Sequence, residues 1–129
     1  MSERLNISSN THWEDVVGYS RVVRIGNIVE VAGTTASQDG KVIHENNAFE
    51  QAYFILKKIE KSLAQAEVTL SDVIRTRVYV ININDWEGIA KAHHEFFKDI
   101  KPVTTLIEVS ALIQPGMLVE IEASAVVKG

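Results

Sequence analysis

The residues best suited to chemistry are two glutamates near the end of the chain. Glu120 and Glu122 lie in an apolar, β-branched run, so on a strand they point to one face about 6.6 Å apart. Enclosure of that face would raise the pKa of at least one of them, through desolvation and mutual repulsion. A carboxyl group with a raised pKa is a candidate general acid or base. The alternative is that both are solvated charges on a strand edge, where they oppose aggregation.

Other side chains are candidates for ligand binding. Tyr19 and Arg21 are two residues apart in a predicted strand and share one face, while Gly33 and Thr34 end the next strand. Each can also be accounted for by structure alone. Tyr19 is a β-forming aromatic suited to an interface, and Gly33 allows a bend at a strand end. The favoured role of three arginines is to form structural ion pairs with the excess carboxylates: Arg21, Arg75 and Arg77.

The spacing of Asn84 and of the histidines favours structural roles over ligand or metal binding. Asn84 with Glu87 three residues later has the spacing of a capping box for a helix. His93 and His94 are adjacent, about 100° apart on a helix, and cannot share a metal as an i, i+4 pair can. The chain has no cysteine. We therefore expect no metal site and no cofactor.

The periodicity of the apolar residues switches between two and about 3.6 along the chain, which separates strands from helices. Gly26 and Asn27 join the first two strands as a two-residue hairpin turn. The predicted elements are strands at 19–25 and 28–34, a helix at 47–66, a strand at 73–81, a helix from residue 84, and strands at 104–109 and 118–127.

This order, β-β-α-β-α-β-β, predicts an α+β fold in one domain over residues 1–129, with both helices covering one face of the sheet. The second face carries alternating polar residues opposite apolar neighbours, a mixture that suits packing against copies of the same chain around polar clefts. The residues assigned to that face are Glu30, Arg75, Arg77, Tyr79, Glu108, Glu120 and Glu122.

Composition excludes several classes of function. The net charge of −4 opposes capture of nucleic acid, and the basic cluster Lys57, Lys58 and Lys61 is expected to be a solvated helix face. The first residues lack the apolar segment of a signal peptide, and no run is long enough to cross a membrane. We expect a cytoplasmic protein that does not associate with membranes.

Five landmarks occur in an order that resembles the RidA family, also called YjgF or L-PSP. They are Gly18-Tyr19-Ser20, Gly26-Asn27, Val31-Ala32-Gly33-Thr34, Asn84-Asp85, and the C-terminal frame of residues 102–109 and 118–123. The resemblance implies a chorismate-mutase-like fold assembled as a homotrimer, with three small-molecule sites at subunit interfaces.

Enzymes of this family hydrolyse enamines and imines of 2-amino acids to the keto acid and ammonia. The resemblance implies that Tyr19 lines the cleft, the Gly33 amide donates a hydrogen bond, Asn84 lies near the site, and Glu120 positions the attacking water. Thr34, Thr104 and Arg21 complete the candidate ligand-binding residues.

Two residues depart from the family pattern. Ala32 stands where typical members have serine, and Thr104 where they have the arginine that pairs with the substrate carboxylate. Threonine donates one hydrogen bond and no charge, and losing a charge-assisted partner in an enclosed site costs about 2 to 5 kcal/mol. An acidic substrate is therefore disfavoured unless Arg21 points into the cleft and replaces the missing charge.

Three functions fit this pattern. The first is a RidA-like site that binds or hydrolyses an imine, enamine or carbonyl compound other than 2-iminopropanoate or 2-aminoacrylate. The second is a non-catalytic ligand-binding or regulatory trimer that uses the same clefts. The third, an endoribonuclease, is least favoured because the chain is acidic and no pair of histidines suggests acid-base cleavage.

Overall fold

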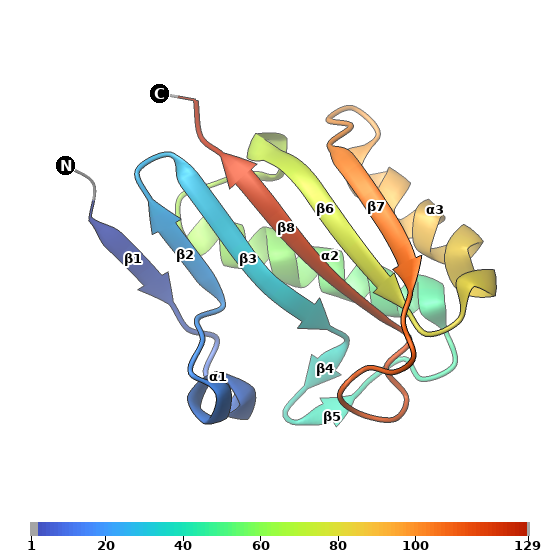
Figure 1. Cartoon of the computed structure of the whole chain (residues 1–129). Helices are drawn as coiled ribbons and strands as arrows, with labels where there is room; N and C mark the ends of the chain where they lie inside the picture. The colour runs from blue at the N-terminus through green and yellow to red at the C-terminus, as the bar shows by residue number, and fades with distance from the viewer. Residues whose placement is uncertain (1–2, 129) are drawn as a thin grey trace.

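A mixed sheet of six strands, in the order β1-β2-β3-β8-β6-β7, forms the centre of the molecule (Figure 1). The computed structural model describes residues 3–128, so residues 1, 2 and 129 of the predicted domain lie outside it. The sheet strands are β1 (Arg4–Ile7), β2 (Val22–Ile25), β3 (Ile28–Thr35), β6 (Val73–Val80), β7 (Val103–Glu108) and β8 (Val119–Val126). The longer helices are α2 (Ala48–Gln65) and α3 (Trp86–Phe97). Shorter elements are α1 (His12–Val17), β4 (Ser37–Gln38), β5 (Lys41–Val42), η1 (Leu70–Asp72) and η2 (Ile83–Asp85).

All neighbouring strands are antiparallel except β6 and β7, which are parallel and connected through α3. The predicted hairpin is confirmed: Ile25 pairs with Ile28, and Gly26 takes a φ of 59° between them. Both long helices lie on one face of the sheet, behind it in Figure 1. The predicted α+β fold is therefore confirmed.

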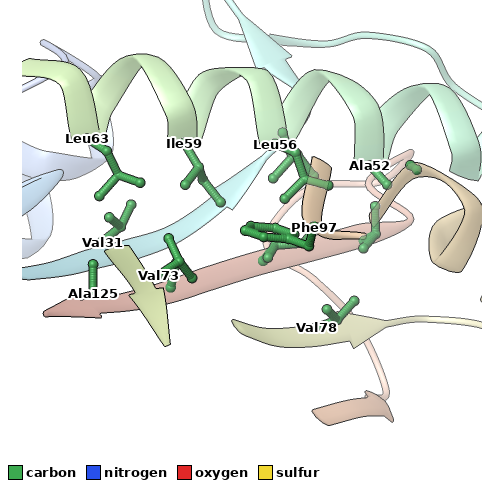
Figure 2. Close-up of a cluster of buried hydrophobic side chains, with 14 of the residues drawn as sticks. Val31, Ala52, Leu56, Ile59, Leu63, Val73, Val78, Phe97 and Ala125 are labelled. Atoms are coloured by element: carbon green, nitrogen blue, oxygen red, sulfur yellow. The ribbon is translucent and has the colours of Figure 1, made fainter. Parts of the chain in front are cut away.

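The core lies between α2, α3 and the sheet. Figure 2 shows Leu56, Ile59 and Leu63 of α2 pointing toward the sheet, with Phe97 at the end of α3 beside them. These four side chains are at most 2% exposed. Each buried leucine or isoleucine contributes about 1.5 to 3 kcal/mol relative to an exposed position. The helix predicted at 47–66 corresponds to α2, and its buried face packs on the sheet.

The sequence prediction missed the N-terminal elements and misplaced one residue. β1, α1 and the β4–β5 hairpin are additions to the predicted order. Alternation along the chain puts Glu108 on the polar second face, but it pairs in register with the buried Val80, which points to the helices. The Glu108 carboxylate instead accepts a hydrogen bond from the Ile83 amide at 2.9 Å. Glu108 therefore adds no negative charge to the second face.

The start of α3 also differs from the prediction. Asn84 lies in η2 rather than at the helix cap, and Asp85 occupies the cap position without a side-chain hydrogen bond. The turn is held by Asn82, whose side chain accepts from the Asn84 amide at 3.0 Å. The capping box of Asn84 and Glu87 is therefore wrong, because a turn of 3-10 helix precedes the α-helix.

The face of the sheet away from the helices exposes large apolar side chains among its polar ones. Ile28, Val103, Ile107 and Val126 are between 41% and 60% exposed. They alternate with inward-facing residues on β3, β7 and β8, so they share this open face. Exposed apolar groups of this kind typically mark an interaction surface. No helix within residues 3–128 is long and apolar enough to cross a membrane.

One buried polar side chain joins three segments at the end of the sheet where β8 begins. Gln51 of α2 is fully buried, and its amide nitrogen donates to the carbonyls of Ile43 at 3.2 Å and Gly116 at 2.8 Å. Its carbonyl oxygen accepts from the Leu118 amide at 2.8 Å. Gln51 thus fixes the turn that leads into β8, the strand that carries Glu120.

Replacing Gln51 by leucine should lower the free energy of unfolding by about 3 kcal/mol, because three buried backbone groups lose their partner. Gln65→Leu at the exposed end of the same helix is the matched control and should change it by less than about 0.5 kcal/mol. Urea denaturation measures both. Equal losses in the two variants would contradict the role given to Gln51.

Candidate functional site

The site is organised around Arg21, which extends β2 by one residue. Its backbone amide donates to the Ile7 carbonyl at 2.8 Å, and its carbonyl accepts from the Ala32 amide at 3.0 Å. These bonds hold Arg21 between the ends of β1 and β3. Its side chain is only 4% exposed. A buried guanidinium requires polar partners, because removing a charge from water without them is costly.

The partners of Arg21 come from three directions. One terminal nitrogen donates to the Gly33 carbonyl at 2.8 Å and to the Thr34 hydroxyl at 3.0 Å. The other donates to the Tyr19 hydroxyl at 3.3 Å. The Nε atom makes no hydrogen bond within the described residues and lies 3.9 Å from the Glu14 carboxylate. The guanidinium is thus committed to the protein itself.

Glu14 supplies the counter-charge from α1 and is 5% exposed. Its carboxylate accepts from the Ser9 amide at 3.1 Å, from the Thr11 hydroxyl at 2.9 Å and from the Ser9 hydroxyl. Burial alone would raise its pKa, but the hydrogen bonds, led by that of the Ser9 side chain, outweigh burial and lower the pKa to about 2. Glu14 therefore stays ionised beside Arg21 at neutral pH.

A register shift in β3 shapes the next part of the site. The pairing of β3 with β8 passes from Val31 opposite Ala123 to Thr34 opposite Ile121, and Ala32 and Gly33 are skipped. The Glu120 carboxylate lies directly over Gly33, where a Cβ atom would meet Glu120 Oε2 at 2.2 Å. Only glycine leaves room for Glu120 in this position. The bulge and the missing side chain together place this carboxylate.

Glu120 and Glu122 share one face of β8, as predicted, but their surroundings differ. The Tyr79 hydroxyl donates to Glu122, and Arg77 lies 3.8 Å from it. Within residues 3–128, the side chain of Glu120 has no hydrogen-bond or ion-pair partner. Burial raises the pKa of Glu120, the charge of Glu122 raises it further, and Arg21 partly offsets both. Two carboxyl groups near Arg21 therefore differ in their pKa, which is lowered for Glu14 and raised for Glu120.

A cavity of about 1380 Å³ opens beside these residues, at the end of the sheet where α1 and the β4–β5 hairpin lie (Figure 1). Tyr19, Arg21, Gly33 and Glu120 form part of its wall. Residues 8–13, the β4–β5 hairpin and one side of α2 also line it. The structure therefore brings four of the predicted site residues together around one cavity.

The remaining predicted residues lie elsewhere in the same chain. Thr34 is buried behind the cavity wall, where its hydroxyl holds Arg21. Asn84 is exposed in η2 and does not line the cavity. Thr104 lies on the exposed edge strand β7. The three do not join Tyr19 and Glu120 in one cleft of a single chain.

Thr104 belongs to a chain of hydroxyl groups on the helix side of the sheet. Its Oγ1 atom lies 2.8 Å from that of Thr76, which lies 2.9 Å from His93 Nε2 on α3. Thr76 is fully buried, and this pairing explains how a hydroxyl is accommodated in the core. Burial lowers the pKa of His93, which keeps its imidazole neutral near pH 7.

Sequence reasoning missed Glu14 and the loop before it. The spacing of Thr11 and Glu14 is a helix-start signal of the form Ser/Thr-x-x-Glu, and this signal is present in the chain. This signal does not show that Glu14 lies beside a buried arginine. Within residues 3–128, no three histidine, aspartate or glutamate side chains gather into a possible metal site.

The sequence matches one family over most of its length. The profile described as Endoribonuclease L-PSP matches residues 10–127. An uncharacterized protein of Streptomyces coelicolor is 34% identical over 119 residues, covering 92% of this chain and 89% of that protein. A RutC family protein of Pyrococcus abyssi is 30% identical over 109 residues, covering 83% of this chain and 84% of that protein.

Comparison with solved structures agrees with the family match. A crystal structure of a Mycobacterium tuberculosis member of the YjgF/YER057c/UK114 family is 48% identical with a TM-score of 0.89, covering 97% of this chain and 100% of that chain. A putative endoribonuclease of Thermotoga maritima has a TM-score of 0.82 at 21% identity, covering 96% of this chain and 93% of that chain. The second likeness concerns the fold alone.

Replacing Glu14 by glutamine should destabilise the protein at pH 7 by about 2 to 4 kcal/mol, because Arg21 would remain buried without a counter-charge. The folded-state pKa of Glu14, about 2, lies below its ordinary value of 4.5, so its contribution is present above pH 4.5 and is lost as the pH falls toward 2. The difference between wild type and Glu14→Gln should therefore shrink over that range. Unfolding free energies measured from pH 7 to pH 2 test this, and a constant difference would contradict it.

Proposed function

The chain belongs to the Endoribonuclease L-PSP family, the family of the RidA and YjgF proteins, and from this membership we propose that its cavity hydrolyses an imine or enamine other than the 2-imino acids. The products would be a carbonyl compound and ammonia. The observation that carries the proposal is Glu120, a half-buried carboxylate with a raised pKa in the cavity wall. An acid-base residue works best when its pKa lies closer to the working pH than that of a free carboxyl group.

In the proposed reaction Glu120 takes a proton from a water molecule as the water oxygen bonds to the imine carbon. Glu120 gives this proton to the nitrogen, the hydroxyl proton of the tetrahedral intermediate follows it to the nitrogen through Glu120, and ammonia leaves as the carbon–nitrogen bond breaks and the carbonyl forms. Glu120 is suited to both steps because it has no hydrogen-bond partner within residues 3–128 that would hold its proton or its lone pairs. It is free to act as base and then as acid.

Tyr19 and Gly33 are proposed to orient the ligand. The Tyr19 hydroxyl already accepts a hydrogen bond from Arg21, so its own proton is available to donate to a ligand in the cavity. The bulge takes Gly33 out of the β3–β8 ladder, which makes its backbone amide a candidate donor. Arg21 acts as a positioning residue, because it holds the Tyr19 hydroxyl and the Gly33 carbonyl.

The ion pair and the hydrogen bonds of Arg21 support the exclusion of 2-imino acids as substrates. It borders the cavity with Glu120, but Glu14 neutralises its charge and both of its terminal nitrogens donate hydrogen bonds within the protein. It cannot form a bidentate pair with a substrate carboxylate without breaking that network. The role of Arg21 as a substitute for the missing arginine is therefore not part of the proposal. A carboxylate attached to the imine carbon would also lie beside the negative Glu120.

We propose that the protein assembles as a homotrimer in which neighbouring subunits complete the cavities. The apolar side chains on the open face of the sheet support this, because they would otherwise remain in water. Thr104 points to the helix side of the sheet but is exposed on the edge strand β7, and we propose that a neighbouring subunit reaches it around this edge. Asn84 is exposed in the turn that follows β6.

A ligand-binding trimer without catalysis is the second candidate, because the cavity is present whether or not chemistry follows. Ribonuclease activity, suggested by the family description, is less favoured. His93 is tied to Thr76 in the core, and His12 is the one histidine among the described residues that lines the cavity. The general acid and base of a two-histidine cleavage mechanism are therefore missing from this cavity.

Glu120→Gln should reduce imine hydrolysis by about a hundredfold or more while the protein remains folded. Gly33→Ala should cause a similar loss, because the added methyl group displaces the Glu120 carboxylate, whose flexible end can move without disrupting the fold. Ammonia release from a panel of neutral and charged imines measures the rates, and thermal unfolding checks stability. Ala32→Gly, next to Gly33, is the control. If both test variants bind ligand and turn over as wild type does, the catalytic role of Glu120 is wrong.

Thr104→Arg should confer or increase hydrolysis of 2-iminopropanoate, generated in the assay, on a chain that is otherwise inert toward it. The arginine restores the carboxylate partner that the family uses, and its loss from the chain costs about 2 to 5 kcal/mol. Thr105→Arg on the opposite face of β7 is the matched control and should not gain activity. Activity of the wild type itself would contradict the proposed exclusion of 2-imino acids.

A further inference from the structure

One wall of the cavity is formed by lysines of α2. Lys57, Lys58 and Lys61 all line it, although the sequence alone suggested a solvated helix face. Lys57 and Lys61 are exposed and one turn apart, while Lys58 is half-buried between α2 and the Arg21 network. The three lysines therefore border a concave space, and two of them are also exposed to solvent.

The charge of this cavity is opposite to that of the protein. Its wall carries four positive side chains, Arg21 and the three lysines, and two negative ones, Asp39 and Glu120. The chain as a whole has a net charge of −4. Arg21 is neutralised by Glu14, whereas no carboxylate lies within ion-pairing distance of the three lysines among residues 3–128. The unbalanced positive charge belongs to the lysines.

The lysine positions are unfavourable for the fold itself. Lys57 and Lys61 are like charges four residues apart, and such pairs repel and destabilise a helix. Burial and then the charge of Arg21 lower the pKa of Lys58, while Glu14 only partly offsets them. A bound anion would relieve both the repulsion within the helix and the cost of a buried ammonium.

The cavity also has more room than a small imine requires. Ligand pockets usually enclose about 300 to 1,000 Å³, and 2-iminopropanoate has about six non-hydrogen atoms. The volume here is about 1380 Å³. Beyond Glu120 the cavity continues between α2 and residues 8–13. Ammonium groups are suited to bind an oxyanion through charge-assisted hydrogen bonds.

We propose that the wall formed by Lys57, Lys58 and Lys61 binds the carboxylate or phosphate of a small-molecule ligand whose reactive carbon lies at Glu120. This deepens the proposed function and rests on it: the substrate would carry its negative charge several bonds away from the imine carbon. The separation follows from the two regions of the cavity, one negative at Glu120 and one positive at α2.

Calorimetric titration with citrate and with pyrophosphate tests the proposal and separates the two kinds of oxyanion. Wild-type protein should bind at least one of them. The triple variant Lys57→Gln, Lys58→Gln, Lys61→Gln should bind it about tenfold or more weakly. A control with the same loss of charge, Lys91→Gln, Lys98→Gln, Lys101→Gln, replaces exposed lysines outside the cavity and should bind within about twofold of wild type.

The double variant Lys57→Gln, Lys61→Gln keeps the half-buried lysine. It provides the same test if the triple variant does not fold. It should unfold at the same temperature as wild type or higher, because a like-charge pair has been removed. The neutral ester trimethyl citrate should not bind. Equal weakening in the control variant, or no binding of either anion to wild type, would overturn the proposal.

Two further measurements distinguish a small-anion site from a nucleic-acid surface and from the reaction at Glu120. If a 20-nucleotide polyuridylate binds more tightly than citrate and pyrophosphate, in a lysine-dependent way, the wall is a nucleic-acid surface and the proposal is wrong. Binding requires no turnover, so it is measured equally in Glu120→Gln protein. Anion binding without imine hydrolysis would overturn the proposed reaction alone, and hydrolysis without anion binding would overturn the lysine wall alone.

Discussion

The burial of one charged side chain, Arg21, is the constraint on which this end of the molecule depends. A guanidinium out of water is tolerated only when its donors and its charge are satisfied. Glu14 supplies the charge from α1, while Gly33 and Thr34 supply acceptors from β3. Arg21 therefore joins α1 to the sheet, and the bulge in β3 keeps the shape that its hydrogen bonds require.

Two carboxyl groups near Arg21 differ in their pKa values. Glu14 is surrounded by donors and remains a strong acid, with a pKa of about 2. Glu120 lies on the other side of the network without such donors, and burial raises its pKa. Two carboxyl groups whose surroundings shift their pKa values in opposite directions divide structural and chemical roles between them. Glu14 has the structural role, and Glu120 is the carboxyl group that we propose for catalysis.

Much of the fold could be predicted from the sequence, because the apolar periods of α2 and of the central strands are long and regular. The site was harder. Alternation along β7 shows that Thr104 and Glu108 share a face, but only the parallel register with β6 shows that this face points to the helices. The role of Glu14 was hidden for a similar reason, since Arg21 comes from a different element. The placement of Glu120 over Gly33 likewise depends on a bulge that the local sequence pattern does not predict.

The hydroxyl chain from His93 through Thr76 to Thr104 has a direction as well as a position. Thr76 has a single hydroxyl proton and can give it to only one neighbour. When His93 Nε2 carries no proton, Thr76 donates to it and Thr104 must donate inward, so that Thr104 offers the outside a lone pair. When Nε2 carries the proton, every bond reverses and the Thr104 proton turns outward, where the Pro102 carbonyl lies 3.4 Å away as one acceptor. The tautomer of a half-buried imidazole on α3 thus sets the hydrogen-bonding polarity of an exposed threonine on the edge of the sheet.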